Sequence, residues 1–186
     1  QDSLLTVDRI NQSCHKILKA KEWLGLTSDV QLDTLNVLNR AQNDDSEFLI
    51  RRLEEGALTL LKNVEEEIPV AELKNQKIAV LALGNSDSEA FVNQLKRYAN
   101  LHTFDTGMDE ASDFDRLIIS IHKSNASPWK SYKITDAEKE IIRDFSKKTS
   151  VSLVVFANPY SLLNADYLNH VKSVLMAYQN SKTMQS

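Results

Sequence analysis

The pattern of apolar and polar residues divides the chain into a helical first part and an alternating second part. In the first part, apolar residues recur every three or four positions, as in an amphipathic helix over residues 5–24. From residue 77 onward, runs rich in Val, Ile and Leu alternate with amphipathic helices. Such buried strands separated by helices are typical of a parallel sheet that is covered on both faces. The second part is therefore predicted to be an α/β domain.

Two long helices are predicted before residue 70. The first has Thr6 as its expected N-cap and Gly25 as a left-handed residue after its C-terminus. Residues 27–45 then form a crossover with polar ends around one short apolar helix (Leu32, Leu35 and Leu38). The second long helix begins at Asp44. Its apolar face runs along Leu49, Leu53, Ala57 and Leu60, and Gly56 within it predicts close backbone packing.

Five strands are predicted in the second part, over 77–84, 101–104, 116–122, 152–158 and 173–179. The helix over 86–99 directs Phe91, Leu95 and Tyr98 inward. The helix over 136–148 begins with a capping box made by Thr135 and Glu138. Right-handed crossovers then give a three-layer αβα sandwich with a mostly parallel five-stranded sheet in the order 2-1-3-4-5, preceded by an N-terminal helix.

Composition narrows the possible partners. The net charge of −4, with no basic stripe, argues against a nucleic-acid surface. No apolar run approaches the ~20 residues that span a bilayer, so no membrane partner is expected. The four histidines have no metal-ligand spacing, and the standard phosphate-binding glycine motifs are absent. We therefore expect neither a metal nor a cofactor.

Candidate ligand residues follow three of the predicted strands. In an open α/β sheet, ligands bind at the carboxyl ends of the strands where the strand order reverses. The residues at those ends are Asn85, Ser86, His122, Lys123, Asn158 and Tyr160. His122 is expected to be the exposed histidine. The competing and favoured interpretation is that these residues cap helices and turn corners.

Three stretches together resemble glycoside hydrolase family 3. Residues 8–26 are similar to the last helix of that family's catalytic barrel, which ends in A-K-x-x-L-G-L, matched here by Ala20-Lys21 and Leu24-Gly25-Leu26. Residues 55–70, with their L-L-K-N sequence and a following Pro, resemble the entry into the second domain. The runs KIAVLALG and SLVVFANPYSLL match the first and fourth strands of that domain. The resemblance is closest to β-N-acetylhexosaminidase-like members from the Bacteroides group.

The resemblance implies a division of the chain into three parts. Residues 1–26 would be the last helix of a catalytic barrel that is not in this sequence, 27–45 a crossover linker, and 46–186 an αβα-sandwich domain truncated at its C-terminus. In the family the nucleophilic aspartate lies on the barrel, as does the His-Asp acid/base pair of the hexosaminidase-like branch. The chain would then be a non-catalytic accessory domain, inactive alone, of a retaining enzyme that cleaves β-N-acetylglucosaminides.

The same resemblance implies partners and a location. The expected partners are the catalytic barrel of the parent chain and a carbohydrate at the domain interface. Exposed apolar positions on helix 5–24 would also favour self-association. The family relationship points to a periplasmic or secreted protein.

The sequence also leaves two different functional classes open. The chain could be a stand-alone flavodoxin-like binding module that uses the loops at Asn85 and His122, with Trp129 and Tyr132 as the only aromatic hint of a flavin. The strand ending Leu83-Gly84-Asn85 lacks the acidic residues that a response module needs. The other class is a structural scaffold without any ligand.

Overall fold

The computed structural model describes residues 5–26, 36–38, 44–124, 126–127, 129, 131–163 and 165–186. The chain forms two compact units, residues 1–43 and 44–186, and each is described here by itself. No helix in the described part of the chain is both long enough and apolar enough to cross a membrane.

The first unit contains the predicted N-terminal helix, α1 (Val7–Trp23). The Thr6 hydroxyl accepts a hydrogen bond from the backbone N of Arg9 at 3.2 Å, and Gly25 has a φ of 69°, as predicted for the two ends. None of the α1 residues is buried. Its apolar side chains, among them Ile10, Ile17 and Leu18, are more than half exposed. Of the short helix expected after it, Leu32 and Leu35 lie outside the described residues, and Leu38 is helical.

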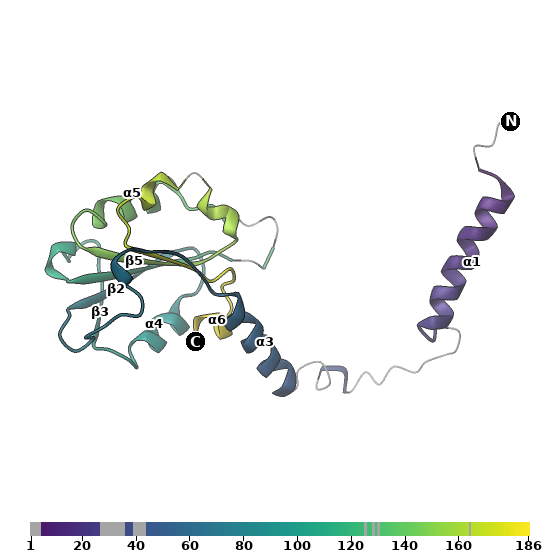
Figure 1. The fold of residues 1–186 in the computed structure, drawn as a ribbon, viewed down its shortest axis with the longest axis horizontal. Helices are drawn as coiled ribbons and strands as arrows, with labels where there is room; N and C mark the ends of the chain where they lie inside the picture. Colours follow the sequence, from purple (N-terminus) through teal and green to yellow (C-terminus); the bar gives the residue numbers. More distant parts are fainter. Residues whose placement is uncertain are drawn as a thin grey trace. The chain divides into compact units, whose positions relative to one another are not determined.

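The second unit is built on a six-stranded sheet (Figure 1). Its strands are β1 (Thr59–Asn63), β2 (Ile78–Gly84), β3 (Leu101–Thr103), β4 (Arg116–His122), β5 (Ser150–Phe156) and β6 (Ser173–Met176), in the order β1-β6-β5-β4-β2-β3. All neighbours are parallel except β1 and β6. The five predicted strands occur in the predicted order 2-1-3-4-5.

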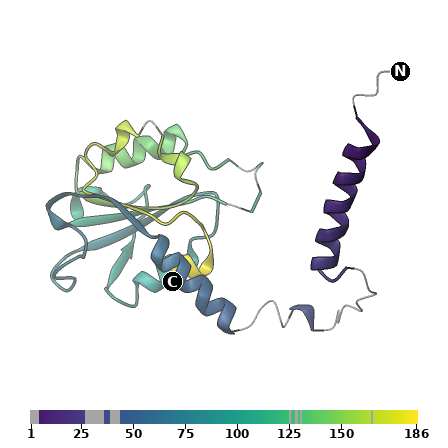
Figure 2. The same ribbon diagram turned by 45° about the vertical axis from the view of Figure 1, so that its right-hand side comes forward.

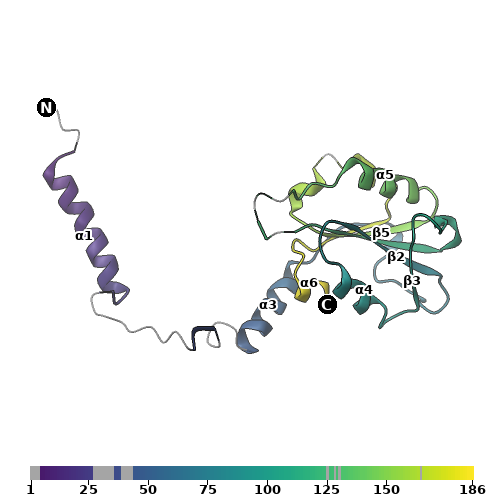
Figure 3. The same ribbon diagram turned by 180° about the vertical axis from the view of Figure 1, so that it is seen from behind.

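Helices cover both faces of this sheet. They are α3 (Asp44–Ala57), α4 (Glu89–Leu95), α5 (Asp136–Phe145) and α6 (Lys182–Gln185), with the short 3-10 helices η1 (Val64–Glu66), η2 (Ala111–Asp113), η3 (Pro159–Leu162) and η4 (Asp166–Leu168). Figures 1 to 3 show α5 with the yellow-green η3 and η4 on one face, and α4 with α6 on the other. The three-layer αβα sandwich is confirmed. Thr135 and Glu138 form the predicted capping box of α5.

Alternate residues of the central strands face opposite cores. Ile119 and Leu153 belong to the larger core, under α5, whereas Ile118 and Val154 belong to the smaller core, which includes Phe91 of α4. Both faces of each strand are therefore apolar, which explains the near-continuous Val/Ile/Leu runs in the sequence. Each fully buried side chain of this kind stabilises the fold by about 1.5–3 kcal/mol.

The sixth strand, β1, was not predicted. Leu60 was expected to extend the apolar face of the preceding helix, but α3 ends at Ala57 and Leu60 lies in β1. The strand pairs antiparallel with β6, more than a hundred residues later, with an irregularity between Leu60 and Lys62. The Lys62 ammonium also donates to the backbone oxygens of Leu168 and Asn169, at 3.0 and 3.1 Å. These distant partners outweigh the local helical pattern.

Three smaller predictions about helices are wrong. The helix predicted over 86–99 is only Glu89–Leu95, and the chain from Lys96 to Ala99 leaves it in turns. Tyr98, expected to face inward, is 70% exposed as a result. Gly56 was expected to mark close backbone packing, but a methyl group placed there would meet nothing within 4 Å.

Candidate functional site

Three of the loops expected to hold a ligand lie at one edge of the sheet. The residues Gly84 of β2, His122 of β4 and Phe156 of β5 are in register, so their strands end side by side. Gly84 has a φ of 116°, and an added Cβ would lie 2.0 Å from the His122 backbone oxygen. Only glycine allows β2 to approach β4 so closely here. The backbone N of Asn85 then donates to the same oxygen at 3.0 Å.

The His122 side chain is fully buried rather than exposed, which corrects the sequence-based expectation. It is the last residue of β4, and its ring stacks on Phe156 with 4.8 Å between centroids. Phe91 of α4 packs against the same ring at 5.9 Å. Removing the imidazole from water lowers the pKa of His122, although its hydrogen bond to Asn180 and the charge of Asp87 act in the opposite direction.

A network of side-chain amides encloses His122. Its Nδ1 lies 2.7 Å from Oδ1 of Asn180, and because an amide oxygen can only accept, Nδ1 carries the proton. The Asn180 amide nitrogen donates to the Ser86 hydroxyl and to the Asp87 backbone oxygen, both at 2.9 Å. Gln185 of α6 donates to Asn180 and Asp87. Two candidate residues, Ser86 and His122, are thus held by the segment that follows β6.

Lys123 points to the opposite face of the sheet. Its ammonium group lies 2.7 and 2.8 Å from the two carboxylate oxygens of Glu138, on α5. The side chains of Lys123 and Glu138 are 3% and 13% exposed, so this ion pair is largely dry. Glu138 also accepts from the backbone N of Thr135 at 2.7 Å. The structure therefore separates His122 and Lys123, which the sequence placed together at one site.

Tyr167 is buried near the same ion pair. Burial, followed by the nearby charges of Asp166 and Glu138, raises the pKa of Tyr167 to about 12. Its hydroxyl has no hydrogen-bond partner within the described residues. The phenol therefore remains neutral and does not act as a base at ordinary pH.

The loop after β5 turns a corner. The Asn158 side chain accepts from the backbone N of Tyr160 at 3.0 Å, which caps η3 and sets Pro159 as its first residue. The Tyr160 side chain is 63% exposed. Of the candidate residues, Asn85 and Tyr160 are exposed, so these two are open to a partner.

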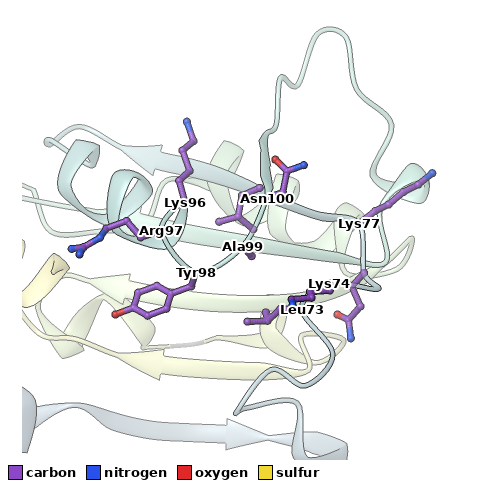
Figure 4. A pocket seen from close by; sticks show the side chains of 10 residues that line it. Leu73, Lys74, Lys77, Lys96, Arg97, Tyr98, Ala99 and Asn100 are labelled. Carbon is purple, nitrogen blue, oxygen red and sulfur yellow. The ribbon is translucent and has the colours of Figure 1, made fainter.

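A pocket of about 800 Å³ lies at the opposite edge, where β2 and β3 begin (Figure 4). Ten residues line it, of which four are cationic and none is acidic. Figure 4 shows that Lys96, Arg97 and Tyr98 come from the turns after α4, whereas Lys74 and Lys77 come from the segment before β2. Sequence reasoning missed this pocket, because it placed Tyr98 inside the helix and considered only the carboxyl ends.

Possible metal ligands are dispersed in the described parts of the chain. No group of three or more His, Cys, Asp or Glu side chains there is arranged to hold a metal ion. The exposed His102 instead pairs with Asp109, whose carboxylate oxygen lies 2.8 Å from Nε2. The hydrogen bond from the Asp105 backbone, followed by that from His102, lowers the pKa of Asp109.

Comparison with solved structures finds the same fold in carbohydrate-active enzymes. A β-glucoside phosphorylase, BglX, superposes on 98% of this chain with a TM-score of 0.67 and 20% identity. A family 3 β-N-acetylglucosaminidase from Paenibacillus sp. gives 97% coverage, a TM-score of 0.58 and 16% identity. A β-glucosidase from Listeria innocua, as a mutant with laminaribiose, gives 97% coverage, 0.71 and 16% identity.

The fold is that found in glycoside hydrolase family 3 enzymes. The chain spans only about a third of those proteins, 36% of the phosphorylase and of the acetylglucosaminidase and 30% of the β-glucosidase. This partial coverage agrees with the sequence resemblance to the second domain of the family. No protein-family model matches the chain, and no curated protein matches it in sequence.

Proposed function

We propose that the chain is the non-catalytic αβα-sandwich domain of a retaining β-glycoside hydrolase of family 3, together with the last helix of its catalytic barrel. The observation that carries this proposal is the share of each chain that superposes. Nearly the whole chain, 97–98%, superposes on about a third of enzymes that act on β-glucosides or are named β-N-acetylglucosaminidases. The remaining two thirds of such an enzyme would supply the catalytic machinery.

The contacts of the acidic side chains support a non-catalytic role. A retaining glycosidase uses two carboxyl groups roughly 5–5.5 Å apart on either side of the glycosidic bond. Glu65 instead pairs with Lys172 at 2.7 Å, and Glu67 pairs with the buried guanidinium of Arg116. Glu138 is held by Lys123. Each of these three carboxylates therefore faces a basic side chain of the chain itself rather than a second carboxyl group.

The two exposed apolar helices support an attachment to a larger body. The α1 side chains Ile10, Ile17 and Leu18 are each 55–57% exposed, and Leu49 and Leu53 of α3 are 57% and 64% exposed. A row of exposed apolar side chains on one helix face is typical of a surface that contacts a partner. We assign that partner, for α1, to the catalytic barrel of the parent enzyme. A periplasmic or secreted location and cleavage of β-N-acetylglucosaminides are part of the proposal and rest on the sequence resemblance.

Hydrolysis assays test the proposal. The chain of residues 1–186 and the full-length gene product that contains it would each be given p-nitrophenyl β-N-acetylglucosaminide and p-nitrophenyl β-glucoside. We expect the chain to be inactive and the longer product to release p-nitrophenol from the acetylglucosaminide. Preference for the glucoside would correct the substrate but keep the domain assignment.

Two results would overturn the proposal. Hydrolysis by the chain alone would show that catalytic groups lie within residues 1–186. A gene product no longer than this chain would mean that there is no larger enzyme to which this domain belongs. In the second case a titration with flavin mononucleotide would test the flavodoxin-like alternative at the Asn85 and His122 loops.

A further inference from the structure

We propose that the pocket at the amino ends of β2 and β3 binds a short acidic oligosaccharide. We call it the basic pocket, and the residues that line it include Lys74, Lys77, Lys96, Tyr98 and Asn100. The proposal goes beyond the accessory role, because the pocket belongs wholly to the second unit and lies at the edge opposite the loops considered above. It can be tested without a catalytic barrel.

The basic pocket is lined by cations without acidic neighbours. The side chains of Lys74, Lys77 and Lys96 are exposed, and no ion pair within the described residues involves them. No acidic residue lines the pocket, although the whole chain has a net charge of −4. Cations that have no acidic partner and that line one pocket raise the local concentration of an anion. A carboxylate-bearing ligand therefore suits this pocket better than a neutral one.

An aromatic side chain, Tyr98, and an amide side chain, Asn100, line the pocket beside those cations. Tyr98 is 70% exposed, so one face of its ring is open for stacking on the apolar face of a sugar. The exposed Asn100 amide makes no side-chain hydrogen bond within the described residues and is free to bind hydroxyl groups. The volume of about 800 Å³ lies within the usual size range for ligand pockets.

The segment before β2, which forms one wall of the basic pocket, is held in place by hydrogen bonds. The Gln76 amide donates to the Ala71 backbone oxygen at 3.1 Å, and its oxygen lies 3.4 Å from Nε of Arg116. Arg116 is itself buried, paired with Glu67 and bonded to the Ser152 hydroxyl at 3.1 Å. An ordered wall of this kind reduces the entropy lost on binding.

Helix capping and nucleic-acid binding account for these cations less well. Lys96 and Arg97 follow the C-terminus of α4, where cations offset the helix dipole, but this does not account for Lys74 and Lys77 in a different segment. A nucleic acid would extend beyond the pocket, and its phosphates would be repelled by the rest of the chain, which has a net charge of −4. Charge interactions are screened over about 8–10 Å in ordinary salt. A short anion in the pocket therefore interacts with the pocket cations and not with the acidic residues farther away.

The test is a calorimetric titration of the full chain with trigalacturonate at low ionic strength, with maltotriose as the neutral control. We expect saturable binding of trigalacturonate with a Kd at or below about 1 mM. The binding should weaken as salt is added, because exposed charges are screened. Maltotriose should bind at least several-fold more weakly.

Variants assign the binding to the pocket. Lys96→Gln should weaken binding about two- to five-fold, since that is the effect of one exposed charge contact. Tyr98→Ala should weaken it roughly three- to ten-fold by removing the stacking surface, whereas Tyr98→Phe should not. Lys182→Gln, at an exposed lysine of α6, is the matched control and should leave binding unchanged.

Four results would overturn the proposal. They are no binding of trigalacturonate, equal binding of maltotriose, equal or tighter binding of pyrophosphate or of a short oligonucleotide, and pocket variants that bind like Lys182→Gln. The third would show a general anion site, and the last would place the ligand elsewhere. None of these results depends on whether the parent enzyme is a glycoside hydrolase.

Discussion

The carboxyl and amino edges of the same parallel sheet use their polar side chains in opposite ways. At the carboxyl edge, Asn180 forms hydrogen bonds with both His122 and Ser86, and Lys123 forms an ion pair with Glu138. At the amino edge, the cations of the basic pocket have no acidic partner among the described residues that line it. Open α/β sheets usually bind ligands at the carboxyl edge. Here that edge is closed, in the sense that His122 and Lys123 are buried, whereas the amino edge is open, because its lysines are exposed.

This difference shows that a position in a fold is not enough to identify a site. The carboxyl edge holds the residue types of a ligand site, but the Lys123 ammonium, Nδ1 of His122 and the Ser86 hydroxyl already have partners within the chain. Nε2 of His122 is buried and has no hydrogen-bond partner within the described residues. A substrate would have to replace hydrogen bonds of 2.7–2.9 Å that tie β4 and the loop after β2 to the C-terminal segment.

Gly84→Ala should destabilise the domain most, by about 4 kcal/mol, because the new Cβ would collide with the His122 backbone at a positive φ. Chemical denaturation of the full chain measures the loss. Gly56→Ala is the matched control, since its Cβ has open space on α3, and it should stabilise the helix by about 0.5–1 kcal/mol. Similar values for the two variants would mean that β2 and β4 are not closely apposed at this edge.

Lys123→Ala should cost about 3 kcal/mol, because it leaves the largely buried Glu138 carboxylate without its cation. The free energy of unfolding, compared with that of the Lys139→Ala control, measures the effect. Lys139 pairs with Asp136, which is 95% exposed, so its loss should cost less than about 0.5 kcal/mol. If Lys123→Ala were as mild as the control, Lys123 would be accessible to solvent, and the closed-edge description would fail.

The stability of the chain should fall as the pH drops through about 6.5 because of His122. Burial lowers its pKa in the folded state, so between the two pKa values the unfolded chain binds more protons than the folded one. The contribution of neutral His122 to the free energy of unfolding is fully present above pH 6.5. It is lost progressively as the pH falls toward the pKa of His122 in the folded state. Denaturation midpoints from pH 7.5 to 5.5 should decline more steeply for the wild type than for His122→Phe. Parallel profiles would rule out His122 as the cause.

Lys96→Gln at the amino edge should change the free energy of unfolding by less than about 0.5 kcal/mol, because the side chain is exposed and makes no ion pair. The same denaturation assay applies. A loss of more than 1 kcal/mol, on the order of the effect of removing a structural hydrogen bond, would mean that this lysine has a structural role.

Much of the fold could be predicted from the sequence because the signals are local. The apolar strands, the Thr135 capping box and the order 2-1-3-4-5 follow from short patterns and from the handedness of crossovers. Strand β1 could not be predicted in this way, because its residues continue a helical apolar spacing and their partner strand is β6, far along the chain. Long-range pairing decided its structure.

The candidate site was predicted less well, and the reason is also physical. The alternation of side chains along a strand already implies that the neighbours His122 and Lys123 point to opposite faces. The apolar run RLIISI predicts a strand that is buried on both faces, but the sequence does not show whether this burial extends to His122, the last residue of β4. The partner of His122, Asn180, lies in a polar C-terminal segment that carries no pattern of its own.

We propose that the carboxyl-edge side chains stabilise the domain and do not contact a substrate. A pH titration of the imidazole nitrogens of His122 in the full chain by NMR tests it most directly. We expect a neutral ring with its proton on Nδ1 and a titration midpoint below 6.5. A midpoint near 6.5, with both nitrogens exchanging freely with water, would show that this edge is open to solvent and would contradict the proposal.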